Sequence, residues 1–306
     1  MKRKFAYLAV SICLFVAISL GLYAVVMDIG TRTAPRHAGA PRQSITKRDT
    51  IRVGVVSRFA PNLIYQGYQP IVDYLNEVTP YHFVLKLGGS YEETIQQLAR
   101  GEVHLAFVGT FVYLKARHKY PIRCLLSPLN SRYEPYFRSV LVTLADSPIR
   151  RVADLAGKSL ALPSPMSFSA NWLLRVELPK HGLHPTDLAA VRHFDFHHTV
   201  IYEILSGRVD AGVVKDRVAE EFFGKGIRVV ASSPPIPGSP LIVRNDLDST
   251  LVLAIQEALL RVDTRKTEYR QLMRDWDPEF THGFTRAQEA AYDGAEHALP
   301  SGEDEP

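Results

Sequence analysis

Hydrophobic and polar residues follow two periodicities along the chain. Short runs rich in β-branched residues, one starting at Ile51 and one at Tyr81, predict strands. The segment QPIVDYLNEV between them repeats its apolar residues every three or four positions, which predicts an amphipathic helix. Another helix is predicted to begin after Ser90, a typical N-cap residue, and to end at Gly101. This alternation predicts a mostly parallel sheet covered by helices.

A second series of strand and helix patterns follows residues 136–144, which predict a strand. It contains a helix over residues 167–183, stopped by Gly182, and the chain's last strong amphipathic helix is the segment STLVLAIQEALLRVD. Two such series joined by extended segments predict two α/β lobes with a ligand cleft between them. One larger doubly wound sheet is the alternative.

The patterns divide the chain into six predicted parts. They are an N-terminal signal anchor or signal peptide (1–30), a linker (31–50), the first part of lobe 1 (51–143), lobe 2 (144–234), a return to lobe 1 (235–281) and a polar C-terminal tail without periodicity (282–306).

The composition excludes several classes of protein. With 46% hydrophobic and 22% charged residues, the 306-residue chain can bury one or two ordinary cores and is not collagenous, coiled-coil or wholly disordered. Its net charge of +4 suggests a nucleic-acid partner. Residues 1–50, however, hold eight basic and two acidic residues, a net charge of +6, so the other 256 residues carry about −2. No nucleic-acid partner is therefore expected for the folded body.

The N-terminal arm predicts export. Three basic residues precede an uncharged run from Phe5 to Met27, whose 23 residues are long enough to cross the hydrocarbon core of a membrane. An uncleaved anchor and a cleaved signal peptide both fit this pattern, and both place the body in the periplasm. The anchor would hold it at the inner membrane. Cys124 is the only cysteine of the body, so we expect a buried thiol rather than a disulfide.

Two strand-to-helix turns carry hydroxyl groups that could bind an anion. In Ser167-Phe168-Ser169, the hydroxyls and the first N–H groups of the helix would point at one spot, with the positive end of the helix dipole behind them. Simple N-capping by Ser167 explains the same residues. Thr110, after Gly109, begins the corresponding helix in the first half of the chain, and there too a helix cap is the alternative.

Two tyrosines and a histidine complete the candidate ligand residues. Tyr68 precedes a predicted helix and could donate to a ligand oxygen or only fix the turn. Tyr91 follows the cap of a third strand-to-helix turn. His197 begins a helix, where its ring could donate to an oxyanion. The eleven histidines suggest a metal site, but no cysteine or carboxylate cluster has the spacing of a zinc site, so neither a metal nor a cofactor is expected.

Six segments from about Ile51 to Leu260 resemble, in order, the PhnD-like periplasmic binding proteins of phosphonate, phosphite and phosphate ABC transporters. The segments are QGYQPIVDYL, SYEETIQQLARGEVHLAFVGT, YFRSVLVTLADSPIRRVADLAGKSLAL, SPMSFSA, FHHTVIYEILSGRVDAGVV and SSPPIPGSPLIVR. The resemblance implies the type II two-lobe binding-protein fold, with a cleft that closes on a small phosphorus oxyanion. It also places His197 at the family's ligand-side histidine and assigns Tyr68 to the ligand.

Some residues depart from the family pattern and narrow the ligand. Ser239 stands where members that bind aminophosphonates can carry an aspartate, and Asp216 and Arg217 are the nearest candidates for an expected glutamate. A ligand ammonium needs such carboxylates. Their loss argues against 2-aminoethylphosphonate and leaves phosphate, phosphite or a simple phosphonate. Ala170 stands where the family usually has a glycine, and its methyl group would crowd a bulky substituent of the ligand.

The sequence thus predicts a monomeric, non-enzymatic solute-binding protein that delivers its ligand to an inner-membrane ABC permease. One alternative is an anchored sensor that acts in trans on a kinase or cyclase. A second is a Ser/His hydrolase built on Ser167 and His197, although no nucleophile-elbow, P-loop or dinucleotide-binding motif occurs.

Overall fold

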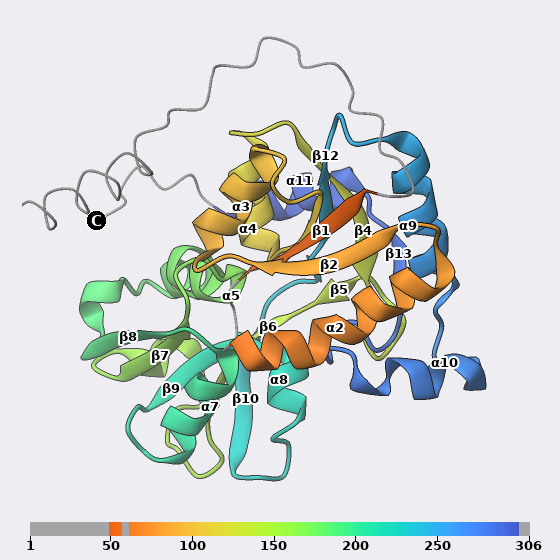
Figure 1. Cartoon of the computed structure of the whole chain (residues 1–306). Coiled ribbons are helices and arrows are strands. Elements are labelled where there is room, and N and C mark those ends of the chain that lie inside the picture. The colour runs from red at the N-terminus through yellow and green to blue at the C-terminus, as the bar shows by residue number, and fades with distance from the viewer. Residues whose placement is uncertain (1–48, 57–60, 300–306) are drawn as a thin grey trace, which may run out of the picture. The chain divides into compact units, whose positions relative to one another are not determined.

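The computed structural model describes residues 49–56 and 61–299 (Figure 1). The predicted anchor at residues 1–30, and the linker as far as residue 48, lie outside the described residues. Within the described ranges, no helix combines the length and the apolar character needed to span a membrane.

Two mixed β-sheets form the framework. The first has the strand order β13-β4-β12-β3-β1-β2 and the second β10-β6-β9-β7-β8. The strands of the first are β1 (Thr50–Val55), β2 (His82–Leu87), β3 (Leu105–Phe107), β4 (Ile122–Pro128), β12 (Leu241–Arg244) and β13 (Phe284–Arg286). Those of the second are β6 (Ser139–Leu144), β7 (Ser159–Pro163), β8 (Ala190–Phe194), β9 (Ala211–Lys215) and β10 (Ile227–Ser232).

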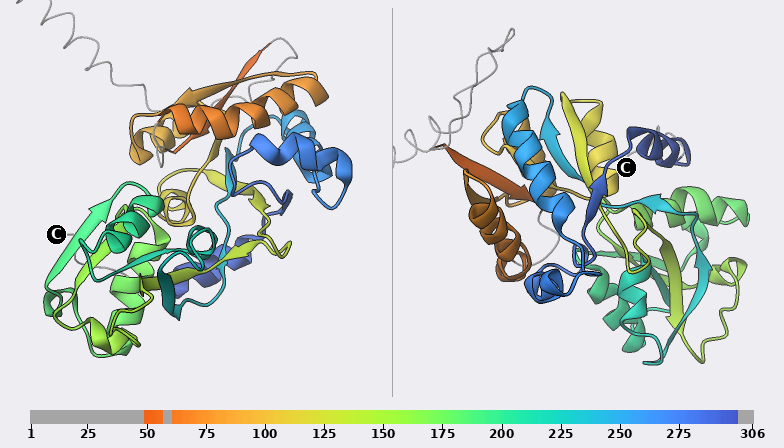
Figure 2. Two further views of the ribbon diagram at one scale, coloured as in Figure 1. Left: turned by 90° about the horizontal axis from the view of Figure 1, so that it is seen from below. Right: turned by 90° about the vertical axis from the view of Figure 1, so that its right-hand side faces the viewer.

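Helices flank both sheets, with α2 and α9 beside the first and α7 and α8 beside the second (Figure 2). The helices are α2 (Pro61–Val78), α3 (Tyr91–Ala99), α4 (Thr110–Arg117), α5 (Phe168–Trp172), α6 (Leu178–Lys180), α7 (His197–Leu205), α8 (Asp216–Glu220), α9 (Ser249–Arg261), α10 (Thr267–Leu272) and α11 (Glu289–His297). A π-helical turn, Leu173–Glu177, joins α5 to α6. The predicted α/β class with helix-flanked sheets is confirmed.

The prediction of mostly parallel sheets is wrong in detail. β1 runs parallel to β2 and β3, and β7 runs parallel to β8 and β9. However, β12 lies antiparallel between β3 and β4, and β6 lies antiparallel between β9 and β10. β6 and β12 each directly follow a passage of the chain from one sheet to the other, so no βα crossover sets their direction. β13 also pairs antiparallel with β4.

The chain makes these two passages through short strands that pair with each other. β5 (Tyr136–Phe137) leads from the first sheet to the second, and β11 (Ile236–Pro237) leads back. They are antiparallel partners in a two-stranded sheet. The first passage therefore precedes Ser139, and the predicted boundary after residue 143 is too late because β6 belongs to the second sheet.

Local helix signals were predicted correctly. The Ser90 hydroxyl accepts a hydrogen bond from the Glu93 N–H at 3.1 Å, as an N-cap does. The C-terminal end of the same helix, α3, is also as predicted. Gly101 follows it with a φ of +74°, a conformation that glycine adopts without strain. Cys124 is buried with a free thiol, as predicted.

The C-terminal segment is not the polar tail that the sequence predicts. β13 pairs with β4, and α11 packs against α4 and β11. Arg117 of α4 forms ion pairs with Asp293, at 2.7 Å, and with Glu296. The hydroxyl of the buried Tyr292 donates to the Gly238 carbonyl at 2.8 Å. Because α11 buries only two residues, Tyr292 and Ala295, it carries no apolar stripe that a sequence pattern could reveal.

We expect Tyr292→Phe to destabilise the protein by about 1–3 kcal/mol, because it leaves the buried Gly238 carbonyl without its donor. Tyr202→Phe is the matched control, since the Tyr202 side chain is 53% exposed. Urea or thermal unfolding measures both variants. Equal stability of the two would contradict the role assigned to the Tyr292 hydroxyl.

Candidate functional site

Four helix N-termini, two from each sheet, meet at one place. α3 follows β2 and α4 follows β3 in the first sheet, while α5 follows β7 and α7 follows β8 in the second. A helix that follows a parallel strand begins at the carboxyl edge of the sheet, where ligands of α/β proteins bind. The first N–H groups of each helix have no partner inside it and carry the positive end of the helix dipole. The site is thus surrounded by positive helix ends.

These N-termini enclose a small cavity. Its volume is about 50 Å³, several times the roughly 10–15 Å³ that one water molecule needs. Five of the seven predicted ligand residues line it, namely Tyr91, Thr110, Ser167, Phe168 and His197. A larger cavity of about 930 Å³ adjoins it, and the two share Phe137, His198, Lys215, Arg217 and Glu279.

Ser167 caps α5 and still faces the cavity. Its Oγ accepts a hydrogen bond from the Ser169 N–H at 3.2 Å and lies 3.5 Å from Nε2 of His197. The Lys215 N–H donates to Nδ1 of His197 at 3.3 Å. In the neutral ring Nδ1 is therefore the acceptor and Nε2 carries the proton, directed at Ser167. With both of these donors on its oxygen, the Ser167 hydroxyl can direct its own proton into the cavity.

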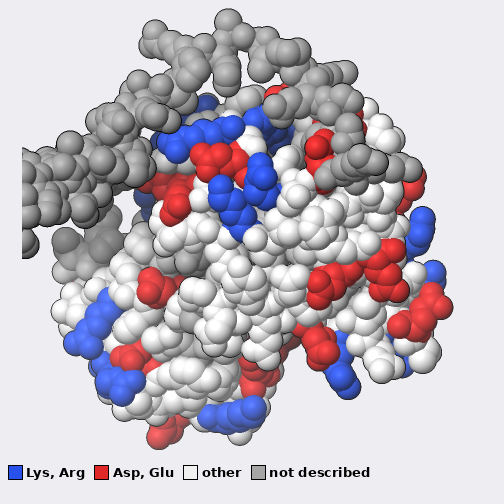
Figure 3. All heavy atoms as spheres, in the orientation of Figure 1, with Lys and Arg blue, Asp and Glu red and all other residues white. Residues whose placement is uncertain are grey.

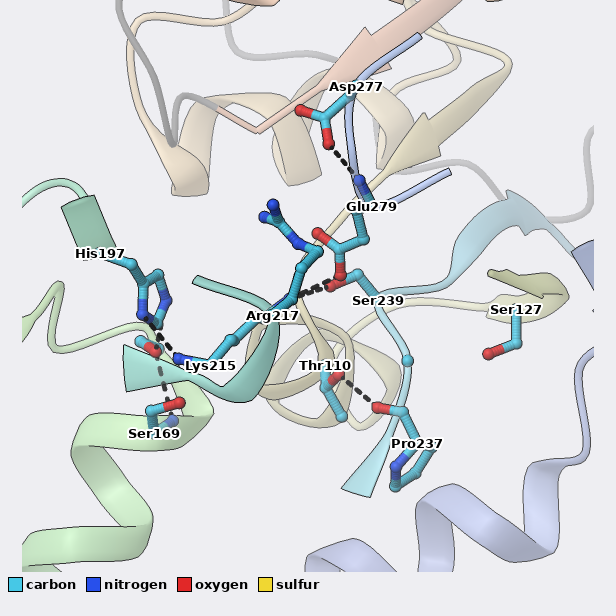
Figure 4. Close-up of polar contacts among 12 residues, drawn as sticks. Thr110, Ser127, Ser169, His197, Lys215, Arg217, Pro237, Ser239, Asp277 and Glu279 are labelled. Atoms are coloured by element: carbon cyan, nitrogen blue, oxygen red, sulfur yellow. Dashed lines mark hydrogen bonds and ion pairs between the residues drawn. The ribbon is translucent and has the colours of Figure 1, made fainter. Parts of the chain in front are cut away.

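The Thr110 hydroxyl is already used. It donates to the Pro237 carbonyl of β11 at 2.8 Å (Figure 4). The predicted role of this hydroxyl as a ligand donor is therefore replaced by a structural one, which fixes the start of α4 against a passage strand. What Thr110 can offer a ligand is its backbone N–H in the first turn of α4.

Tyr68 and Ser169 do not line the cavity. Tyr68 is buried in an aromatic cluster, with its ring centroid 5.3 Å from that of Phe107 and 5.4 Å from that of Phe280. Ser169 is also fully buried, and its hydroxyl is hydrogen-bonded to that of Ser139 at 2.8 Å. Because both residues are buried, their predicted role as ligand donors stays a prediction.

The strongest charged contact of the site was missed by sequence reasoning. Nζ of Lys215, at the end of β9, lies 2.6 Å from a carboxylate oxygen of Glu279 and 2.9 Å from the Ser239 hydroxyl (Figure 4). The two side chains are 12% and 9% exposed. The pair joins the second sheet to the segment that follows α10. The position of Lys215 at the carboxyl end of a predicted strand was a usable signal, whereas Glu279 lies in a segment without periodicity.

Asp216, which the sequence offered as a cleft carboxylate, lines the larger cavity but not the small one. Burial raises its pKa, while hydrogen bonds from the backbone N–H groups of Arg217 and Arg138, both at 2.9 Å, act in the opposite direction. It is therefore a structural acceptor. Arg217 lines both cavities and forms an ion pair with Glu221 at 3.2 Å.

Basic and acidic side chains intermix over the face of the molecule in Figure 3. Lys86 and Glu102 form an ion pair at 2.9 Å, with side chains that are 33% and 43% exposed. Over the ranges that the structure describes, no group of three or more histidine, cysteine or acidic side chains could hold a metal ion.

Comparison with known proteins gives one family. The model described as "ABC transporter, phosphonate, periplasmic substrate-binding protein" matches residues 53–292. The binding-protein component of an ABC phosphonate transporter from Pseudomonas aeruginosa matches with 16% identity and a TM-score of 0.70, over 81% of this chain and 85% of that one.

Two further solved structures have the same fold. PhnD1 from Prochlorococcus marinus, in complex with methylphosphonate, matches with 15% identity and a TM-score of 0.69, over 81% of this chain and 96% of that one. A Xanthomonas citri protein bound to ATP matches with 19% identity and a TM-score of 0.65, over 82% and 96%.

We expect Lys215→Met and Glu279→Gln each to destabilise the protein by about 3–5 kcal/mol, because each leaves a buried charged or polar partner without its counterpart. The double variant should be destabilised by less than the sum of the two single destabilisations. Thermal unfolding of all four proteins measures this coupling. Strictly additive losses would show that the ion pair contributes nothing to stability.

Proposed function

Because the chain belongs to the family of periplasmic substrate-binding proteins of phosphonate ABC transporters, we propose that it binds a small phosphorus oxyanion, namely phosphate, phosphite or a phosphonate. The observation that carries this proposal is the meeting of four helix N-termini around a cavity of about 50 Å³. First-turn N–H groups and hydroxyls hold a tetrahedral oxyanion without requiring net positive charge. The ligand lies between the two sheets.

Release and capture of the ligand involve hinge closure. β5 and β11 are the hinge, because they are the two passages between the sheets and are paired with each other. A change of backbone angles in these few residues alters the separation of the helix ends that face each other across the cavity. The closed form then presents the ligand to an inner-membrane permease. The N-terminal segment holds this monomeric protein at the membrane.

Hydrolysis by Ser167 and His197 is disfavoured by the hydrogen bonds of the ring. A catalytic base must accept the serine proton at Nε2 while its other nitrogen donates to an orienting group. Here Nδ1 accepts from the Lys215 N–H, so Nε2 donates toward Ser167. The pair is a donor set for an anion rather than a nucleophile and its base.

The binding proposal predicts stabilisation of the full-length chain by phosphorus oxyanions. A ligand present at 100 times its dissociation constant should add about 2.7 kcal/mol to the free energy of unfolding. Thermal shifts of the protein, purified in a mild detergent, are measured with phosphate, phosphite, methylphosphonate and sulfate. The absence of a shift with every phosphorus compound would refute the proposed function.

Ser167→Ala should weaken binding of the best of these ligands by about tenfold to a hundredfold, as expected for loss of a hydrogen bond to a charged group. Ser147→Ala is a matched control, because the Ser147 Oγ accepts from the Ile149 N–H at 3.2 Å, two residues on, just as Ser167 accepts from Ser169. Calorimetric titration compares them. Equal affinity of the two variants would remove Ser167 from the site.

A further inference from the structure

The ammonium group of Lys215 is surrounded as a bound cationic ligand would be. A carboxylate oxygen of Glu279 lies 2.6 Å from Nζ, the Ser239 hydroxyl lies 2.9 Å from it, and the centroid of the Phe137 ring is 4.6 Å away. A carboxylate, a neutral oxygen and an aromatic face are the groups that recognise ammonium ions. We call these three side chains the cation cage.

The cation cage borders the cavity that receives the oxyanion. Glu279 and Phe137 line both the small cavity and the larger one beside it, and so does Lys215. A substituent on a phosphonate held by Ser167 and His197 would leave the small cavity past these side chains. The cage therefore stands where the remainder of a larger ligand must pass.

We propose that Lys215 acts as a tethered ammonium that fills the cation cage and thereby selects phosphonates without an amino group. This inference rests on the proposed function. A free aminoalkyl ligand would have to displace Lys215 from Glu279 or place a second cation beside it, and both are unfavourable because the two side chains are only 12% and 9% exposed. Lys215 is thus a specificity residue, and Glu279 is the carboxylate that it keeps occupied.

Two ligands of matched shape test this assignment on the full-length chain. Propylphosphonate and 2-aminoethylphosphonate differ in a terminal methyl group against an ammonium group. The native protein should bind propylphosphonate at least about tenfold more tightly. Lys215→Ala, which empties the cage, should shift the ratio of dissociation constants by about tenfold or more toward the amino compound, the worth of a charge-assisted hydrogen bond.

Two control variants distinguish the effect of the Lys215 charge from the effect of the space that its side chain fills. Lys215→Met removes the charge but keeps the cage filled, so it should show a much smaller shift in the ratio. Lys215→Ala combined with Glu279→Gln should not show the shift toward 2-aminoethylphosphonate, because this variant lacks the carboxylate that would bind the ammonium group. Thermal unfolding establishes that each variant is folded, and the native ratio tests the inference even if one is not.

Several outcomes would overturn the assignment. Equal or tighter binding of 2-aminoethylphosphonate by the native protein would show that the cage is not closed to ligand cations. A ratio in Lys215→Ala within twofold of the native one, with both ligands weakened alike, would make Lys215 a direct partner of the oxyanion instead. Failure of the native protein to bind any phosphorus oxyanion would refute the proposed function and this inference together.

Discussion

The site depends on one geometric constraint, which is that a helix following a parallel strand must begin at the strand's carboxyl edge. Among the helices that follow such strands, α3, α4, α5 and α7 begin at the small cavity. The pairing of β5 with β11 links the two passages between the sheets. The Thr110 hydroxyl, bonded to Pro237, ties one helix start to this pairing. The backbone therefore positions the donors, and the side chains adjust them.

The balance of charge inside the site is consistent with donors that are mainly backbone groups. Lys215 is neutralised by Glu279, and Asp195 lies on the same small cavity as Arg217. Burying a paired charge avoids most of the desolvation penalty that an isolated one would bear. The side chains at the cavity thus contribute little net charge, in agreement with the value of about −2 for residues 51–306. In the proposed function, discrimination among anions would then depend on hydrogen-bond geometry and on the room that the cation cage leaves.

The sequence revealed those features whose partners lie close along the chain. The caps formed by Ser90 and Ser167 involve residues two or three positions away, so the local pattern was sufficient. The Lys215–Glu279 pair spans 64 positions, and no periodicity links its members. The assignment of Tyr68 to the ligand stays a prediction, whereas its place on the buried face of α2 with Ile64 and Ile71 has a helical spacing that is typical of a core residue.

The helix ends also provide a reason why the proposed hinge closure would depend on a ligand. Each N-terminus carries the equivalent of about half an elementary charge. In the proposed closed form, four of them facing one cavity would sum to about two positive charges, and without a ligand these charges would repel one another. A doubly charged phosphorus oxyanion would balance that sum and turn the repulsion into four attractions. Because Lys215 and Glu279 pair with each other, the proposed ligand would itself supply the charge that favours the proposed closed arrangement.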